Sequence, residues 1–196
     1  MKHRKNLGLR IKDRKERGIW AELYFMALAA GYGLKILSPY GGLGPYDVGV
    51  EDGGPILRVQ VKCTIYSHAR GGYRISVRGP KHGAKRRGYE PGTVDFFALY
   101  IVPLDDWYII PYTVIGNRNK VLYFNLDKKL RKYGKYREAW HLLLDACKAR
   151  TDGPIDIQAC CDEGDAAQEP DKGRQVSLAA QFQPTIRKMF RTLFQG

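Results

Sequence analysis

Long apolar runs are missing from this chain, and cysteine and histidine are scarce. No stretch approaches the run of about 18 apolar residues that a membrane-spanning helix needs. The 196 residues include four cysteines and four histidines, and no two cysteines have the C-x-x-C spacing. Neither a disulfide framework nor a structural zinc site is therefore expected. The chain is long enough to bury a core without disulfides or bound zinc. We predict reduced thiols in a cytoplasmic protein.

Acidic residues are few relative to basic ones. Lys and Arg number 33 against 20 Asp and Glu, which gives a formal net charge of +13. Lysine and arginine contacts to phosphates release counterions and so supply sequence-independent affinity for nucleic acid. No lipid-anchoring signal favours a membrane surface instead. The charge predicts a polyanionic partner and a nucleoid-associated location, but by itself it also fits a ribosome-associated or RNA-binding protein.

Four segments differ in composition. A basic N-terminal arm is predicted at residues 1–13, followed by a folded core over residues 14–150. Residues 151–175 are rich in acid and have weak apolar periodicity, which indicates a flexible linker. Residues 176–196 place apolar side chains at helical spacing, which predicts an amphipathic helix that docks on the domain or on a second subunit.

The apolar pattern of the core predicts a helix followed by a series of strands, an α/β (α+β) fold. Asp13 to Glu16 has the spacing of a capping box and opens a helix that ends near Gly31 or Gly33. The basic segment 78–88 is rich in glycine and proline and is predicted to be a surface loop. Strands are predicted at residues 34–37, 46–50, 56–63, 73–77, 94–102 and 107–110, and a second helix at 135–149.

Glu22 stands inside the apolar helical segment 19–30. Phe25 and Met26 occupy the positions one turn later, so no basic residue is available there to pair with the carboxylate. Burying an unpaired carboxylate is costly. Taken alone, Glu22 fits an edge position that reaches water, a salt bridge to a distant arginine, or a functional site.

Two consecutive strands carry the other polar candidates. Side chains alternate along residues 57–63, so Gln60 and Lys62 project from one face, about 7 Å apart along the strand. Asp47 stands where a glycine-rich loop enters the preceding strand. Because a short turn joins the two strands, we expect Asp47 beside Gln60 and Lys62, facing the helix that carries Glu22. Such a group can hold a divalent cation and a phosphodiester together.

The order of these residues resembles the PD-(D/E)XK nuclease superfamily. Glu22 in a first helix is followed by Pro45-Tyr46-Asp47 and then by Gln60-Val61-Lys62. Over residues 14 to 110 the chain is similar to archaeal Holliday-junction resolvases. It is closer still to intron-associated homing endonucleases of bacteria, some of which also use Gln-x-Lys. The resemblance implies a restriction-endonuclease-like core of αβββαβ type, a mixed central β-sheet flanked by helices.

The resemblance also implies a role for each site residue. Asp47 would ligate Mg²⁺, or Mn²⁺ as a substitute, together with the Gln60 side-chain oxygen and the Val61 carbonyl. Glu22 would bind this ion through water or ligate a second one. Lys62 would orient the attacking water and stabilise charge on the phosphate, leaving 5′-phosphate and 3′-hydroxyl ends. Gln60 replaces the usual second acid, which removes one negative charge from the metal site.

Double-stranded DNA is the partner that charge and resemblance imply together. Since one site cuts one strand, we expect a homo-oligomer, either dimer or tetramer. Strand 94–102 and the C-terminal helix are candidate interfaces, and both fit the core of the domain equally well. A resolvase-like nuclease selective for DNA structure is one alternative. A catalytically inactive DNA-binding protein on the same fold is another, which Gln60 favours. The expected phosphate contacts are Arg14, Arg78, Lys81, Lys85, Arg86 and Arg87.

Overall fold

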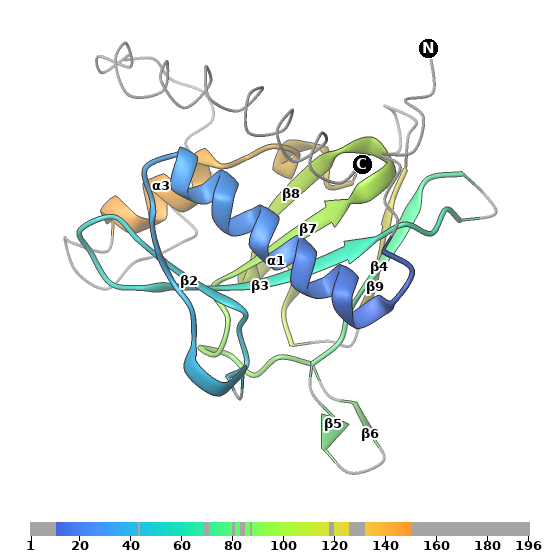
Figure 1. The fold of residues 1–196 in the computed structure, drawn as a ribbon, viewed down its shortest axis with the longest axis horizontal. Coiled ribbons are helices and arrows are strands. Elements are labelled where there is room, and N and C mark those ends of the chain that lie inside the picture. Colours follow the sequence, from blue (N-terminus) through green and yellow to red (C-terminus); the bar gives the residue numbers. More distant parts are fainter. Residues whose placement is uncertain are drawn as a thin grey trace.

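A long helix opens the fold, and a five-stranded mixed sheet follows it (Figure 1). The computed structural model of the chain describes residues 11–42, 44–68, 71–79, 81–82, 85–86, 88–117, 120–125 and 132–149. Strands lie in the order β1-β2-β3-β7-β8; β3 and β7 are parallel, and the other neighbours are antiparallel. The bounds are α1 Arg14–Gly31, β1 Lys35–Leu37, β2 Val48–Glu51, β3 Leu57–Thr64, β7 Phe96–Ile101 and β8 Asp106–Pro111. The predicted fold class, a mixed sheet flanked by helices, is confirmed.

Helix α1 begins at the predicted cap. The Asp13 carboxylate accepts hydrogen bonds from the backbone N–H groups of Lys15 and Glu16 at 2.8 and 2.9 Å. These bonds satisfy two of the N–H groups that the first turn of a helix leaves without partners. The helix ends at Gly31, as expected, and Gly33 then takes a positive φ of 87°. The cap fixes the start of the helix that carries Glu22.

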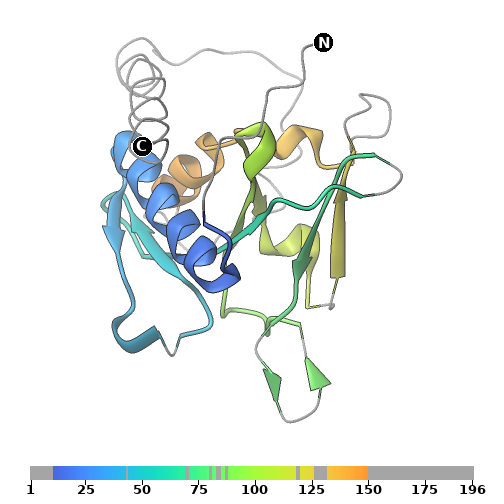
Figure 2. The same ribbon diagram turned by 45° about the vertical axis from the view of Figure 1, so that its right-hand side comes forward.

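The sheet is covered on both faces, so the core has two halves (Figures 1 and 2). Helices α1 and α3 (His141–Ala149) pack on one face, and the antiparallel pair β4 (Tyr73–Val77) and β9 (Lys120–Phe124) packs on the other. Strand β7 serves both halves by alternation. Phe96, Ala98 and Tyr100 face the helices, whereas Phe97, Leu99 and Ile101 face β4 and β9. Because all of β7 is core, strand 94–102 is the core strand that was one of its two predicted roles, and it is not an interface.

The crossover between parallel strands β3 and β7 is made of strands. It carries β4 and a small antiparallel ladder of β5 (Lys81–His82) and β6 (Lys85–Arg86), and its described residues contain no helix. The helix that the expected αβββαβ order puts after the third strand is therefore not found among them. The ladder projects from the body of the domain in both ribbon views (Figures 1 and 2). The predicted surface loop 78–88 therefore contains this short paired segment.

The predicted helix over residues 135–149 is wrong in its first part. Residues Gly134–Tyr136 form a 3-10 turn, and α3 starts only at His141. Glu138 has a positive φ of 53°, and its carboxylate accepts from the Trp107 backbone N–H and the Trp140 indole N–H. These bonds to β8 and to a core tryptophan break the helical course before α3.

Several elements and segments complete the description. Strand β9 and the short helix α2 (Tyr112–Ile115) were not expected from the sequence, and further 3-10 turns lie at Tyr40–Gly42 and Val102–Leu104. Residues 1–10, the predicted linker over 151–175 and the predicted helix over 176–196 lie outside the described residues. Across the described ranges, no helix is long and apolar enough to cross a bilayer.

Candidate active site

Asp47 stands at the point where β2 stops pairing with β3. The β2–β3 register covers only Leu57 to Val59 of β3. The Asp47 backbone N–H donates to the Val59 carbonyl at 3.0 Å, and its Oδ2 accepts the Val61 backbone N–H at 2.8 Å. The carboxylate therefore takes the place of the next ladder partner of β3. Two backbone-based bonds hold it in a defined position at this sheet edge.

Gln60 and Lys62 approach the same carboxylate oxygen. The Gln60 Nε2 donates to Asp47 Oδ2, and the Gln60 side chain is buried, with 4 % of its surface exposed. The Lys62 ammonium lies 4.0 Å from the same oxygen. The structure thus brings Asp47, Gln60 and Lys62 together, and it gives the Asp47 charge both a hydrogen-bond donor and a cation.

The face of β3 on which these side chains lie differs from the expectation. Val59 and Val61 pack into the same half of the core as Trp20 and Ala21 of α1. By alternation, Gln60 and Lys62 point to the opposite face, so they do not face the helix. The prediction on this point is wrong. Asp47 and Lys62 approach Glu22 at the edge of β3 that β2 leaves unpaired.

Glu22 and the Asp47–Lys62 pair are electrostatically coupled. Burial, followed by repulsion from the Asp47 carboxylate, raises the pKa of Glu22 to about 7, against the opposing effect of Lys62. Burial also raises the pKa of Asp47, although Lys62 and the donors on Val61 and Gln60 counteract it. The Glu22 charge therefore changes close to neutral pH. A divalent cation between the two carboxylates would relieve this repulsion.

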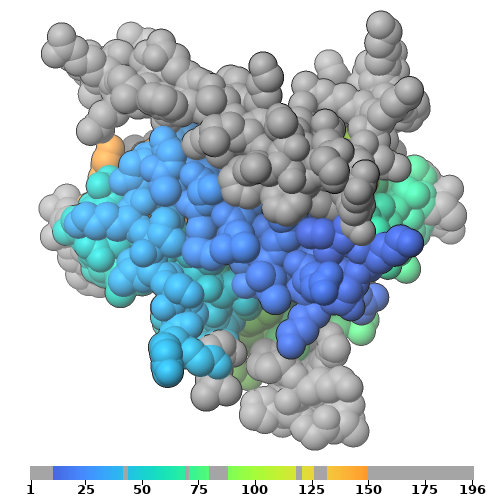
Figure 3. Space-filling model, viewed as in Figure 1, coloured from blue at the N-terminus to red at the C-terminus, as the bar shows by residue number. Residues whose placement is uncertain are grey.

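A cleft of about 630 Å³ opens beside this group, between α1, β3 and β4. It is lined by Glu22, Val61 and Lys62, whereas Asp47 and Gln60 adjoin it through their bonds without lining it. In the space-filling view, α1 forms much of the face turned to the reader, with its outer side uncovered along part of its length (Figure 3). The cations that line the cleft are Arg14, Arg17, Lys62, Arg74 and Arg78.

The expected phosphate-binding residues divide into three groups. Arg14 and Arg78 line the cleft. The backbones of Lys81, Lys85 and Arg86 lie in the projecting β5–β6 ladder (Figure 1). The predicted contact at position 87 lies outside the described residues.

Two cleft arginines were missed from the sequence. Arg74 and Ser76 are exposed on β4 and alternate with the buried Ile75 and Val77. Their alternation was visible as a strand pattern, but nothing in it named the partner surface. Arg17 looked like one more charge of a basic N-terminal region. Its place in the cleft depends on where α1 packs.

The oxygen donors at the site suit a hard divalent cation. Asp47 and Glu22 supply carboxylates, Val61 a backbone carbonyl and Gln60 an amide oxygen, and Mg²⁺ prefers oxygen ligands of these kinds. Within the described residues, no group of three His, Cys, Asp or Glu side chains is arranged to hold a metal. A metal would therefore depend on the Gln60 and Val61 oxygens as well as the two acids. Since Gln60 turns its Nε2 toward Asp47, its amide must turn over before its oxygen meets the ion.

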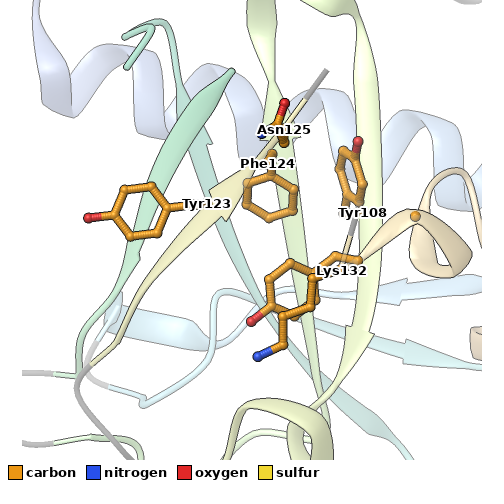
Figure 4. A pocket seen from close by; sticks show the side chains of 7 residues that line it. Tyr108, Tyr123, Phe124, Asn125 and Lys132 are labelled. Atoms are coloured by element: carbon orange, nitrogen blue, oxygen red, sulfur yellow. The ribbon is translucent and has the colours of Figure 1, made fainter. Parts of the chain in front are cut away.

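A second cavity lies on the other side of the sheet, beside β8 and β9 (Figure 4). Its volume is about 10 Å³, enough for about one water molecule. Tyr108 and Phe124 line it, with ring centroids 4.5 Å apart. The cavity is too small for a substrate, whereas the cleft beside Glu22 has room for a nucleic-acid strand.

Comparison with known proteins agrees with the geometry. The sequence model of the PD-(D/E)XK endonuclease family matches residues 12–143, which run from the cap of α1 into α3 and contain Glu22, Asp47, Gln60 and Lys62. No match is found among curated protein sequences. Among solved structures, the bacterial homing endonuclease I-Ssp6803I is similar, with 27% identity over 72% of this chain and 99% of that chain, and a TM-score of 0.63. The chain belongs to the PD-(D/E)XK endonuclease family.

Proposed function

We propose that this endonuclease hydrolyses phosphodiester bonds of duplex DNA with Mg²⁺, in the manner of a homing endonuclease. Its active site is Glu22, Asp47, Gln60 and Lys62. The observation that carries the proposal is the Asp47 carboxylate, which is bound by the Val61 N–H and lies 4.0 Å from the Lys62 ammonium. Together with burial, the larger cause, it raises the pKa of Glu22. Two acids and a lysine meet at the end of a strand beside a basic cleft, an arrangement suited to hydrolysing a phosphodiester.

The metal-binding residues are Asp47, Glu22, Gln60 through its side-chain oxygen and Val61 through its carbonyl. A bound divalent ion would supply Lewis-acid activation of the scissile phosphate and a lowered pKa for water. The substitution of Gln60 for an acid leaves two carboxylates at the site. We therefore expect millimolar rather than micromolar Mg²⁺ to be needed, with Mn²⁺ as an effective substitute.

The chain's own residues bind, orient and stabilise. The Asp47 carboxylate holds the Lys62 ammonium in place, so that it can donate to the attacking water or to a phosphate oxygen. Because its charge is fixed before the reaction, Lys62 opposes the negative charge that develops on the phosphate without further reorganisation. Glu22, with a pKa of about 7, accepts hydrogen bonds from water near the reacting phosphate.

Duplex DNA is the proposed substrate because the cleft and its surroundings are basic. Arg14 and Arg78 line the cleft, and the β5–β6 ladder carries two lysines and an arginine. Contacts of this kind bind the phosphate backbone and give affinity without sequence information. Cutting of both strands would take two copies of the chain related by symmetry, hence the proposed homo-oligomer.

Plasmid nicking tests the proposal. Supercoiled DNA is incubated with the parent, Asp47→Asn or Lys62→Ala in Mg²⁺ or Mn²⁺, with Asp52→Asn in the β2–β3 turn as the matched control. We expect the parent and the control to cut and the two site variants to lose at least about 100-fold in rate. If the parent cuts no form of DNA with either metal, the enzymatic proposal fails and a DNA-binding role remains. Equal cutting by all four proteins would refute the site assignment.

A branched substrate separates the two nuclease alternatives. A four-way junction and a linear duplex of the same sequences are offered to the parent in parallel. A homing-like enzyme is expected to cut linear duplex at a preferred sequence. Much faster cutting of the junction, whatever its sequence, would favour the resolvase-like alternative.

A further inference from the structure

Arg17 is almost wholly buried in the wall of the cleft, with 3 % of its surface exposed. Its Nη1 donates to the carbonyls of Ile11 and Lys12 at 3.5 and 3.3 Å, both long hydrogen bonds. Its guanidinium lies 5.9 Å from the ring centroid of Tyr66, which also lines the cleft. These contacts are with neutral groups; the Asp13 carboxylate, outside ion-pair distance, and the Cys63 thiol also interact electrostatically with Arg17. No ion pair to Arg17 occurs among the described residues.

The partly buried arginines away from the cleft, in contrast, form ion pairs with aspartates. Arg58 pairs with Asp95 at 3.0 Å, and Arg137 pairs with Asp106 at 2.8 Å. A buried charge without such a partner is costly unless a ligand compensates for it. In the described residues, no Arg17 nitrogen is among the fully enclosed polar atoms that lack a hydrogen bond. Each Arg17 nitrogen therefore either has a hydrogen bond or is reached by solvent, and because Arg17 lines the cleft, an N–H that solvent reaches there can meet an anion.

Gly18 leaves the same wall of the cleft bare. It lies within α1, where glycine is less favourable than alanine, and a Cβ added there would meet no atom within 4 Å. Neither packing nor backbone conformation therefore requires glycine. Gly18 also lines the cleft and precedes Glu22 by one turn on the same face of the helix. A bare helix surface beside an active site permits the close approach of a ligand.

We propose that Arg17 and Gly18 form a subsite for a DNA backbone phosphate that neighbours the scissile one. The planar guanidinium donates to two phosphate oxygens, and Gly18 lets the sugar-phosphate chain lie against α1. Arg17 precedes Glu22 by five residues, about 7.5 Å along the helix axis, which separates the subsite from the reacting phosphate. The substrate class of the subsite rests on the proposed function. The subsite adds Arg17 and Gly18, which were not predicted from the sequence, to the DNA-contacting residues.

DNA affinity and thermal stability together test the subsite. The anisotropy of a fluorescein-labelled 30-base-pair duplex, about three helical turns long, is measured in EDTA over a range of KCl concentrations, so that no cutting interferes. Arg17→Gln is expected to bind at least about tenfold more weakly, with a salt slope smaller by about 0.9. Its melting temperature should be unchanged or higher, because an unpaired buried charge is removed. Lys35→Gln, which removes an exposed cation outside the cleft, is the matched control and should behave as the parent.

Gly18→Ala should change stability and DNA affinity in opposite directions. The added methyl should raise the melting temperature by about 2–4 °C through helix propensity and weaken DNA binding several-fold by crowding the subsite. Ile19→Ala changes the neighbouring exposed position, which does not line the cleft, and should leave affinity unchanged. A structural role for Gly18 would instead lower stability and affinity together. That result would overturn the subsite.

A third variant covers the case in which Arg17→Gln fails to fold. Arg17→Lys keeps the charge but lacks the planar fork, so it should bind several-fold more weakly at an unchanged salt slope. Parental affinity in Arg17→Lys, or parental affinity and slope in Arg17→Gln, would overturn the proposal. Failure of the proposed function is a separate result: a parent that binds duplex but never cuts it with Mg²⁺ or Mn²⁺ leaves these binding comparisons decisive.

Discussion

Replacing Glu22 with glutamine should stabilise the metal-free protein above neutral pH. In the parent, burial and the nearby Asp47 charge raise the pKa of Glu22 from 4.5 to about 7. Ionisation of this side chain therefore opposes folding. Glutamine has nearly the same shape and carries no charge, so it removes the cost while keeping the packing of α1 against β3.

The sign of the effect follows from proton binding. Between pH 4.5 and about 7 the folded chain holds the Glu22 proton more tightly than the unfolded chain does, so the free energy of unfolding falls as pH rises. Below this window the carboxyl is protonated in both states and the cost vanishes; above it the cost is complete. The difference between the two pKa values corresponds to about 3.4 kcal/mol, at about 1.36 kcal/mol per pKa unit. Because Glu22 is only partly buried, solvent screening reduces this to about 1–2 kcal/mol.

Urea unfolding in EDTA at pH 4, 6 and 8 measures the difference. Parent and Glu22→Gln should agree at pH 4, and the variant should be more stable by about 1–2 kcal/mol at pH 8. Glu16→Gln, an exposed carboxylate in the first turn of the same helix, controls for charge removal and should change stability by only a few tenths of a kcal/mol. Equal stability of parent and Glu22→Gln at pH 8, or a less stable variant, would refute the electrostatic reasoning.

Magnesium extends the same experiment to function. An ion that binds only the folded state raises the free energy of unfolding by mass action. Parent stability at pH 8 should therefore rise with added Mg²⁺, and Glu22→Gln should gain clearly less, since one ligand is lost. If Mg²⁺ raises the free energy of unfolding equally in both proteins, Glu22 is not a metal ligand. The raised pKa of Glu22 would be unaffected.

Three further variants test the surrounding charges. Asp47→Asn removes the second cause of the raised Glu22 pKa, so the stability cost of Glu22 should become smaller and be complete at a lower pH; an unchanged pH profile would contradict the coupling. Gln60→Glu adds a third acid to the site, so it should destabilise the metal-free protein at pH 8. It should also lower the Mg²⁺ concentration that gives half-maximal cutting. If that concentration is unchanged, position 60 is not a metal ligand. Arg58→Ala removes the ion pair with Asp95, which keeps the backbone N–H of position 58, and should cost about 1.5–3 kcal/mol in urea unfolding; a cost below about 1 kcal/mol would mean that solvent replaces the pair.

Local sequence signals were sufficient for much of the sheet and for α1. The cap at Asp13 and the apolar run behind it predicted the helix because both signals act within a few residues. Alternation predicted β3 and β4 for the same reason. The break at Glu138 could not be predicted, because its carboxylate is bound by Trp107 of β8 and Trp140, which lie elsewhere in the fold.

The candidate site was predictable as a set of residues but not as an arrangement. Alternation shows that Gln60 and Lys62 share a face of β3, yet it does not say which face meets α1. The facing is determined by tertiary packing, because Val59 and Val61 lie in the half of the core that contains the helices. Arg17 was missed because a charged residue at the start of a helix usually stays in solvent, and its burial arises from tertiary packing.

The early end of β2 also bears on how the protein avoids unwanted association. Strand β3 continues from Gln60 to Thr64 without a β2 neighbour in the described residues, and an unpaired strand edge invites another strand to add to it. Here the Asp47 carboxylate already occupies the Val61 N–H, and the charged Lys62 stands beside it. The residues that would cut DNA thereby protect the edge against self-pairing. Asparagine at position 47 preserves an acceptor for that N–H, whereas alanine exposes it, so an inactive variant intended for crystallisation with DNA should carry asparagine.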